Sequence, residues 1–474
     1  MPNVPARSRF MRVWLALVGA GCLAGVCFAE PPGPAQTDAQ PILEWDQLTG
    51  DWVGMRPMLS DHGVEFFANY TLDAWGNVSG RRKQGSTHAS TINYSSVYGD
   101  LNFGAQVDLE KAVGWQGASM STTWVWLYGW NTNEEALNPD GKYLGVSNIA
   151  GFNTLRLFTL WFQQKLWDDK ISIRVGQLAA DAEFFRSTYG GVLISDTFTW
   201  PAIVGLNLPN KGQAFPMGTL GARVAWNPVD WFTFQSAVFQ GNVFAQNVNR
   251  FGFLWRLDAQ TGYTFFNEAQ FRWNQRGGET GLPGQLKPGL WFQTGQSADP
   301  LASSTSSGNG GFYIVLDQML YREPANPSPA CHAPDGKSAA NGKGAKTFET
   351  PALPTKSDQG LGWFARAGFT PPDRNFLDFY FDTGLTYKGL IPGRDNDTMS
   401  IGFAYGHLSN GARSSLRSQD INPTDSEMVV ELTYQAPVTR WLIVQPDLQY
   451  FINPGANSEL TNALVIEARA TVIF

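Results

Sequence analysis

The chain has 474 residues, of which 43% are hydrophobic, 14% aromatic and only 16% charged, and its formal net charge is −7. Soluble domains usually carry about 25% charged residues. A mean hydropathy of −0.22 argues against a bundle of membrane-spanning helices, each of which needs roughly 20 apolar residues in a row. An acidic chain also lacks the basic surface needed to bind nucleic acid. The composition, with 50 glycines, favours a large β-protein whose apolar residues are dispersed.

Residues 1–29 have the layout of a secretory signal peptide. Three arginines come first, residues 13–26 are apolar, and small residues precede Glu30. A membrane anchor is the alternative, but the apolar stretch is short for that role. The sequence therefore predicts export, followed by a periplasmic or plug-like segment over 30–63. A short helix within 41–63 could sit inside the barrel mouth or pack on its rim.

Cysteine and histidine give little support for metal or disulfide chemistry. Cleavage of the signal peptide leaves one cysteine, Cys331, so the mature chain cannot form an internal disulfide. The four histidines are scattered at His62, His88, His332 and His407. No spacing matches a metal site, and we expect neither a metal nor an organic cofactor.

The rest of the chain consists of long alternating segments. Between Ser96 and Glu110, apolar residues alternate with polar ones. A period of two over ten or more residues predicts a strand, here longer than the usual five or six residues. The pattern recurs in sixteen segments, namely 64–75, 96–110, 118–130, 155–166, 171–177, 219–226, 231–240, 262–274, 286–295, 311–322, 361–369, 377–388, 398–408, 426–435, 440–451 and 462–474.

We expect these strands to form an all-β fold, a transmembrane antiparallel β-barrel of about 16 strands over residues 64–474. In hydrocarbon every backbone N–H and C=O needs a protein partner, so a membrane-spanning sheet must close on itself. One face then meets lipid and the other lines a lumen. The last strand ends at Phe474, which resembles the sorting signal that the bacterial outer-membrane assembly machinery recognises.

One stretch does not fit a simple up-and-down count. If both chain ends are periplasmic, the long segment 323–360 also falls on the periplasmic side, where turns are normally short. Two explanations stay open: an exceptional insertion, or an error in the predicted strands between 296 and 400. The Pro, Gly, Ala and Lys content of 323–360 predicts a flexible insertion.

Several runs of residues carry a family resemblance. They include Asp317-Gln318-Met319-Leu320-Tyr321-Arg322, Tyr387-Lys388-Gly389-Leu390-Ile391-Pro392-Gly393-Arg394-Asp395, Gln445-Pro446-Asp447-Leu448-Gln449-Tyr450 and, upstream, Leu48-Thr49-Gly50-Asp51-Trp52. With these runs the chain resembles the bacterial carbohydrate-selective porin (OprB) family over nearly all of its mature length. The resemblance implies a sixteen-stranded barrel whose narrowed channel passes glucose and related sugars by diffusion.

The period of two also places charged side chains on the lumen face. Candidates for lining the channel and binding the solute are Arg174, Arg223, Glu268, Arg272, Asp317, Arg366 and Asp382, with Trp161 as a ring for stacking on a sugar. The segment 178–218 is too long for a hairpin and could fold inward, bringing Glu183 and Arg186 into the channel. Arginine and carboxylate groups can exchange hydrogen bonds with sugar hydroxyls. Alternatively, these charges pair with one another and only hold the barrel's shape.

The predicted function is passive, carbohydrate-selective diffusion through the bacterial outer membrane. Expected partners are small sugars, outer-membrane lipid and lipopolysaccharide, and the assembly machinery through Phe474. A general small-solute porin is the alternative, since only the family resemblance points to sugar. A barrel enzyme would need a nucleophile and a histidine at matching positions, and His407 with Ser409 is weak support, so we expect no enzymatic activity. A soluble sandwich or a channel for strongly charged solutes fits the strand pattern and the mixed lumen charges less well.

Overall fold

Alternating hydrophobicity produces strands that each bury one face and leave the other to the membrane. The computed structural model describes residues 41–79, 94–130, 143–257, 262–275, 281–298, 305–324 and 358–474. All sixteen predicted strands are present. They are β1 (Val64–Ser79), β2 (Tyr94–Asp108), β3 (Ala118–Trp130), β4 (Thr154–Leu166), β5 (Ile171–Leu178), β6 (Thr219–Val229), β7 (Phe232–Gln240), β8 (Tyr263–Trp273), β9 (Gly284–Ala298), β10 (Thr305–Arg322), β11 (Gly360–Phe369), β12 (Leu377–Lys388), β13 (Thr398–Leu408), β14 (Ser426–Pro437), β15 (Leu442–Ile452) and β16 (Ala463–Ile473).

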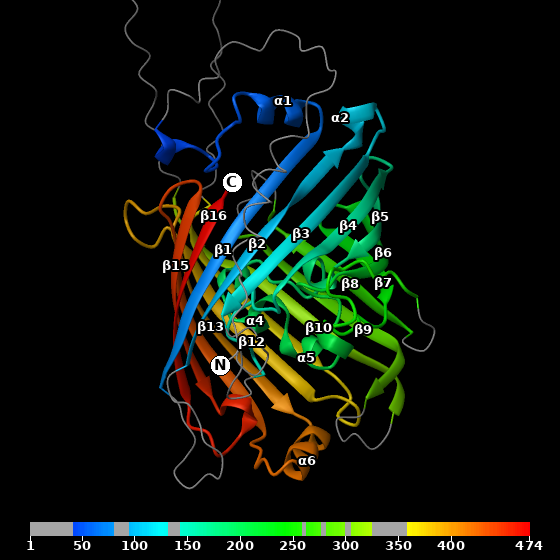
Figure 1. The fold of residues 1–474 in the computed structure, drawn as a ribbon, viewed down its shortest axis with the longest axis vertical. Helices are drawn as coiled ribbons and strands as arrows, with labels where there is room; N and C mark the ends of the chain where they lie inside the picture. The colour runs from blue at the N-terminus through cyan, green and yellow to red at the C-terminus, as the bar shows by residue number, and fades with distance from the viewer. Residues whose placement is uncertain are drawn as a thin grey trace, which may run out of the picture.

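Each strand pairs antiparallel with its neighbours in the chain, and β1 pairs with β16 to close the barrel. Figure 1 shows the strands tilted around the barrel, with the C-terminus at the same end as the start of β1. We call this the terminal end and the opposite one the outer end. None of the helices among the described residues is long and apolar enough to cross a membrane.

The strands between 296 and 400 are as predicted, so the strand prediction was not in error there. The remaining explanation is an exceptional connection between β10 and β11. Arg322 at the end of β10 pairs with Gly360 at the start of β11, at the terminal end of the barrel. The next connection, 370–376, is a short turn at the outer end between β11 and β12. The predicted flexibility of 323–360 concerns residues that lie largely outside the described ranges, as does Cys331.

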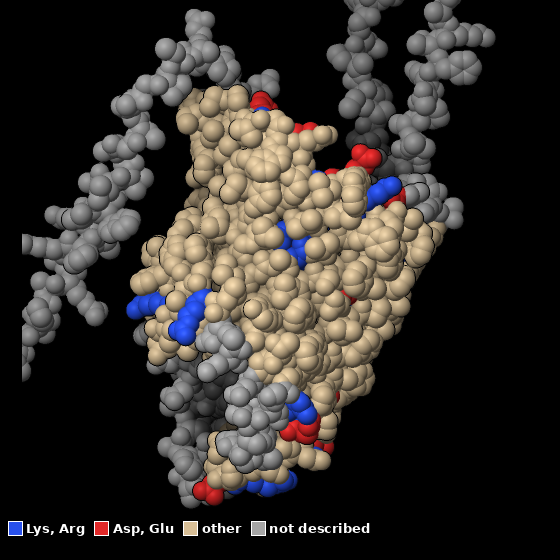
Figure 2. Space-filling model, turned by 90° about the vertical axis from the view of Figure 1, so that its right-hand side faces the viewer, with Lys and Arg blue, Asp and Glu red and all other residues tan. Residues whose placement is uncertain are grey.

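The outward face of the barrel is apolar, as the alternation predicts. Leu290, Ile401 and Ile466 point away from the lumen and keep about half of their surface exposed, at 47%, 47% and 50%. Figure 2 shows that one side of the barrel carries few charged side chains between its two ends. A wall in hydrocarbon must pair its backbone groups within the protein, and the closed sheet does so for most of this one.

The segment before β1 lies across the terminal end, beside the last strand (Figure 1). It contains the predicted short helix, α1 (Met55–Asp61). The Leu48 N–H donates to the Ile473 carbonyl at 2.8 Å, and the Trp441 Nε1 donates to the Ile42 carbonyl at 2.8 Å. These contacts join the segment before β1 to the turn before β15 and to β16. Residues 1–40, including the predicted signal peptide, lie outside the described part of the chain.

Arg56 makes the contact in this segment that we expect to matter most for stability. Its Nη1 donates to the Phe474 carbonyl at 3.2 Å, and its guanidinium lies 4.3 Å from the centre of the Trp52 ring. Changing Arg56 to alanine should lower the free energy of unfolding by about 1 kcal/mol, measured as earlier loss of the compact electrophoretic band on heating. Arg440→Ala is the matched control, because Arg440 and its partner Asp46 are 71% and 81% exposed, and so open an ion pair should contribute little to stability. An equal effect of both changes would contradict a specific role for Arg56.

Candidate functional site

The connection between β5 and β6 does not project outward but crosses the lumen. We call residues 179–218 the inner loop. It contains short helical turns, among them α4 (Asp196–Thr199) and α5 (Ala202–Gly205). Its buried Phe184, Phe185, Phe198 and Ile203 pack against inward-facing side chains such as Phe266 and Tyr313. The prediction that 178–218 folds inward is therefore confirmed.

Wall carboxylates hold the inner loop by its backbone. Glu268 on β8 accepts from the Phe185 N–H at 3.1 Å, and Asp317 on β10 accepts from the Thr188 N–H at 3.1 Å. Glu431 on β14 accepts from the Ser195 N–H at 3.0 Å. Backbone groups inside a barrel are cut off from bulk water and must find a protein partner. These acids supply it along a path from β8 to β14.

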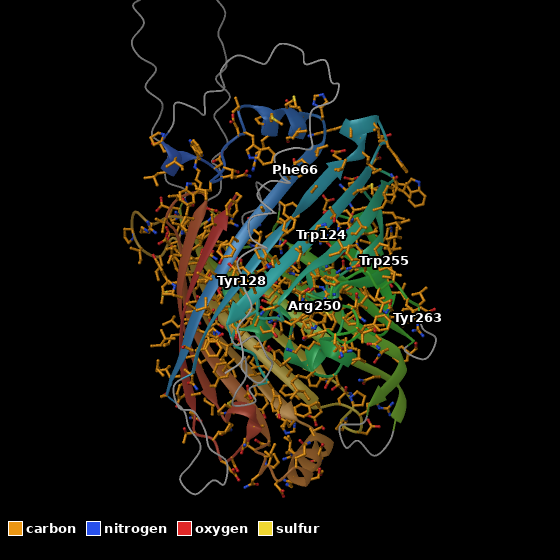
Figure 3. All side chains as sticks on the ribbon, viewed as in Figure 1. Phe66, Trp124, Tyr128, Arg250, Trp255 and Tyr263 are labelled. Carbon is orange, nitrogen blue, oxygen red and sulfur yellow. The ribbon has the colours of Figure 1, made fainter. Side chains whose placement is uncertain are left out.

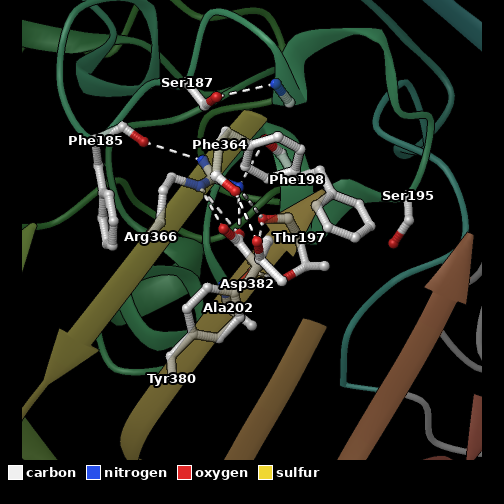
Figure 4. A network of polar contacts seen from close by, with 12 residues as sticks. Phe185, Ser187, Ser195, Thr197, Phe198, Ala202, Phe364, Arg366, Tyr380 and Asp382 are labelled. Carbon is white, nitrogen blue, oxygen red and sulfur yellow. Dashed lines mark hydrogen bonds and ion pairs between the residues drawn. The ribbon is translucent and has the colours of Figure 1, made fainter. Parts of the chain in front are cut away.

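The strongest of these anchors is a buried ion pair between Arg366 on β11 and Asp382 on β12. Both side chains are 0% exposed, and the closest nitrogen–oxygen distance is 2.5 Å. Arg366 also donates to the carbonyls of Phe185 at 3.0 Å and Phe198 at 2.9 Å, and Tyr380 donates to Asp382 at 2.6 Å. Figure 4 shows how these contacts converge on the guanidinium. The pair thus ties two separate turns of the inner loop to one place on the wall.

A second ionic group remains partly accessible. Glu183 of the inner loop bridges Arg174 on β5 at 2.7 Å and Arg223 on β6 at 2.5 Å. Arg174 also lies over the Trp161 ring, 4.0 Å from its centre. The Arg174 and Glu183 side chains keep 21% and 15% of their surface exposed. This cluster therefore presents charge and an aromatic face together.

The predicted residues separate into groups. Glu268, Asp317, Arg366 and Asp382 are buried anchors of the inner loop, while Arg174, Glu183, Arg223 and Trp161 form the ionic group. Arg186 is exposed, and its carbonyl accepts from Lys287. Arg272 belongs to neither group: it donates to Thr233 at 2.6 Å near the turn between β6 and β7, at the terminal end.

A second connection also enters the lumen, the described part (143–153) of the link between β3 and β4. The Tyr143 and Leu144 N–H groups donate to Glu427 on β14 at 3.0 Å. Asn148 donates from its backbone N–H to the Ile194 carbonyl at 2.9 Å. The two loops therefore meet inside the barrel.

A cavity of about 220 Å³ lies where they meet. Its lining combines aromatic rings with charged groups and includes Trp75, Tyr98, Trp200, Asp181, Asp196 and Lys211. Burial raises the pKa of the Asp181 carboxyl to about 6, and burial also raises the pKa of Asp196. The alternation places Trp75 on the lumen face, whereas Tyr98, Trp200 and the two aspartates were not among the predicted site residues, because only the path of two loops brings them together.

The raised pKa of Asp181 has a measurable consequence. Its Oδ2 accepts from the Phe215 N–H at 2.8 Å, and its Oδ1 is buried with no partner among the described residues. The unfolded chain ionises from its ordinary pKa of 3.8 upward, whereas the folded protein keeps the proton until about pH 6. Stability from this group is thus full below pH 3.8 and lost as the pH rises to about 6.

Asp181→Asn mimics the protonated carboxyl. The free energy of unfolding of the variant, relative to that of the unmodified protein, should rise by about 2 kcal/mol between pH 4 and pH 6. Above pH 6 this difference should level off. Urea unfolding of the two proteins across this range measures the difference. A difference that does not change with pH would contradict a buried, protonated Asp181.

Sequence reasoning also missed Arg156 on β4. This side chain is 0% exposed and faces inward, with Phe152 5.5 Å away and Met217 Sδ 2.7 Å from its Nη1. Counting in steps of two from Trp161 places residue 156 outside. A bulge in the pairing of β3 and β4, between Thr123 and Trp124, reverses that assignment. Bulges of this kind shift which residues face inward and are not visible in the alternation.

An antiparallel barrel with an apolar exterior and a lumen crossed by an anchored loop defines an outer-membrane porin. Residues 94–474 match the family described as "Carbohydrate-selective porin, OprB family". The chain belongs to this family, so the resemblance seen in the sequence is confirmed.

Individual relatives agree over almost the whole chain. Porin B of Pseudomonas aeruginosa is 23% identical over 468 residues, covering 92% of each chain. The putative porin QuiX of Acinetobacter baylyi is also 23% identical over 468 residues, covering 93% of this chain and 96% of its own. The high-pH structure of Pseudomonas putida OprB superimposes with a TM-score of 0.72 at 23% identity, covering 91% of this chain and 99% of that one. That likeness supports the fold.

Proposed function

We propose that this porin passes single sugar rings, such as glucose, through the cavity between its two inward loops. The observation that carries the proposal is the lining, which offers aromatic faces next to carboxyl and ammonium groups. Trp75 and Trp200 provide flat apolar surfaces for the C–H face of a pyranose. Asp196 and Lys211 accept from and donate to its hydroxyl groups in place of water. Binding remains weak, so that the sugar leaves again.

The ionic group of Arg174, Glu183, Arg223 and Trp161 is proposed as a second contact for the sugar, together with the exposed Arg186. Its support is the combination of partly accessible charges of both signs and one aromatic ring. The four buried anchors act indirectly in this proposal, by fixing how wide the remaining passage is. Arg272 would contact a solute only near the terminal end.

Export by residues 1–29 and insertion by the assembly machinery belong to the same proposal. The amphipathic β16 and the terminal Phe474 support recognition by that machinery. The outer-membrane location follows from the porin family, and the lipid partners are those that surround any such barrel.

Liposome swelling with the purified, refolded protein tests the proposed selectivity. We expect glucose to enter faster than a neutral amino acid of similar size, and a disaccharide to enter more slowly than either. Rates ordered by size alone would favour the alternative, a general small-solute porin. No swelling by inserted protein would reject both.

A pair of variants tests the cavity itself. Asp196→Asn should lower the glucose rate several-fold and leave the amino-acid rate unchanged. Asp169→Asn is the matched control, since Asp169 is 64% exposed at a turn of the terminal end, paired with Lys165. Equal slowing of both solutes by Asp196→Asn would mean that this residue affects only the width of the passage.

A further inference from the structure

The barrel wall has an irregular place beside β4. The strand β5 has 8 residues and pairs with β4 from Leu160 to Leu166. Beyond Leu178 the chain turns into the lumen as the inner loop. The outer part of β4, from Thr154 to Thr159, therefore has no β5 backbone paired with it, and only the Gln177 side chain of β5 reaches it, donating to the Leu157 and Phe158 carbonyls at 2.9 Å.

Part of the connection between β7 and β8 covers this stretch. The Leu157 N–H donates to the Phe251 carbonyl at 3.0 Å, and Thr154 Oγ1 donates to the Arg250 carbonyl at 2.7 Å. Trp255 Nε1 donates to Gln177 Oε1 at 2.7 Å, at the far end of β5. Gly252 has φ +80°, and a Cβ there would lie 2.1 Å from the Leu157 carbonyl oxygen. The segment thus fits closely against the strand edge and completes the wall.

The covering segment is on the membrane side of the barrel. Phe253 packs edge-on against Trp124, with ring centres 5.6 Å apart. Trp124 has the same orientation on β3 as Trp126 and Tyr128, which are 49% and 39% exposed on the outward face. Phe251 and Trp255 are themselves 60% and 50% exposed. Figure 3 shows Trp124, Arg250 and Trp255 on the same side of the barrel.

The segment also lies at the outer end of β4, because Thr154 is the first residue of a strand that ends at the 167–170 turn of the terminal end. In an outer-membrane barrel, the outer ends of the strands lie close to the boundary between acyl chains and head groups. Aromatic side chains favour this boundary, where one part of the ring is in lipid and another near water.

Two exposed arginines stand among these rings, Arg250 and Arg256, and Arg250 Nη2 also donates to the Asn153 carbonyl at 3.4 Å. A guanidinium has five N–H donors, so it can bind an anion in addition to its contacts within the protein. Guanidinium groups bind phosphate through paired, charge-assisted hydrogen bonds. Apolar rings beside two cations complement a molecule that carries phosphates on a sugar head group and long acyl chains below it.

We propose that Arg250, Phe251, Phe253, Trp255 and Arg256, here called the arginine–aromatic patch, bind the phosphorylated glycolipid of the outer leaflet. The two arginines hold its phosphates, and the three rings lie along its acyl chains. The bound lipid presses the covering segment against β4 and seals the place where the wall lacks β5. This site is independent of the proposed sugar path.

Titration of the detergent-solubilised protein with bisphosphorylated lipid A, followed by native mass spectrometry, tests the site. The double variant Arg250→Ala/Arg256→Ala should bind the lipid at least about tenfold more weakly than the unmodified protein does. The unmodified protein should bind phosphate-free lipid A as weakly as the double variant binds the bisphosphorylated form. The double variant and the unmodified protein should not differ in their affinity for inorganic phosphate, because phosphate alone lacks the acyl chains.

The matched control removes two arginines from another outer-end loop, Arg413→Ala/Arg417→Ala on α6 (Asn410–Ser418). It carries the same change in charge and should bind lipid A like the unmodified protein. Heat-dependent electrophoretic mobility establishes that each variant is a folded barrel. Equal lipid A affinity of the patch variant and the unmodified protein would overturn the proposal. An equal loss in the control would also overturn it, because net charge would then explain the binding.

Discussion

Replacing Arg366 by alanine should both destabilise the barrel and open its channel to larger solutes. The change leaves Asp382 buried without its counter-charge and removes the hydrogen bonds to the Phe185 and Phe198 carbonyls. Breaking a buried ion pair from one side costs about 3–5 kcal/mol. With two turns of the inner loop released from the wall, a disaccharide should enter liposomes at a rate approaching that of glucose. Heat-dependent mobility and swelling measure the two effects.

A double variant separates the ion pair from the loop contacts. Arg366→Met/Asp382→Leu replaces the pair by apolar side chains of similar size, which is often close to neutral for stability. It still lacks the donors to the loop carbonyls, so it should recover only part of the stability that Arg366→Ala loses and should remain permeable to the disaccharide. If this variant excludes the disaccharide, the contacts from Arg366 to the loop backbone do not set the width of the channel.

Replacing Glu183 by glutamine should change which charges the channel admits. Glu183 contacts both Arg174 and Arg223, and its neutral analogue leaves two guanidinium groups without that carboxylate. At an effective dielectric constant of about 20, two unit charges 4 Å apart interact with an energy of about 4 kcal/mol before salt screening. We therefore expect the entry of a sugar acid relative to its neutral sugar to rise about tenfold.

Swelling rates for glucose and gluconate, compared within one preparation, give this ratio. Asp169→Asn carries the same charge change outside the lumen and should leave the ratio as it is. A fall in both rates with an unchanged ratio would assign Glu183 a purely steric role.

The wall of this barrel could be predicted from the sequence, because a strand in a membrane has only two faces. The alternation from Ser96 to Glu110 alone fixes which residues meet lipid, and the same rule located every other strand. One exception is Arg156, where a bulge reverses the two faces. One extra residue in a strand leaves no trace in its composition.

The interior was harder to predict, because its contacts join residues that are far apart in the chain. Glu431 accepts a hydrogen bond from the Ser195 N–H, 236 residues away in the sequence. Arg366 donates to the Phe198 carbonyl, 168 residues away. The alternation predicts the lumen face for Arg366, and both side chains lie there in the structure. Their use as anchors depends on the path of the inner loop, which no local pattern encodes. Mutual pairing, the alternative role of the lumen charges, thus describes Arg366 and Asp382.

The anchors of the inner loop have a consequence for how such channels diverge. Glu268, Glu431 and Arg366 bind N–H and carbonyl groups of the loop, which nearly every amino acid offers. Mutations in the loop can therefore alter the side chains that line the passage without moving its backbone. With such a wall, natural or designed changes in the loop sequence can alter which solute the channel prefers while the barrel stays the same.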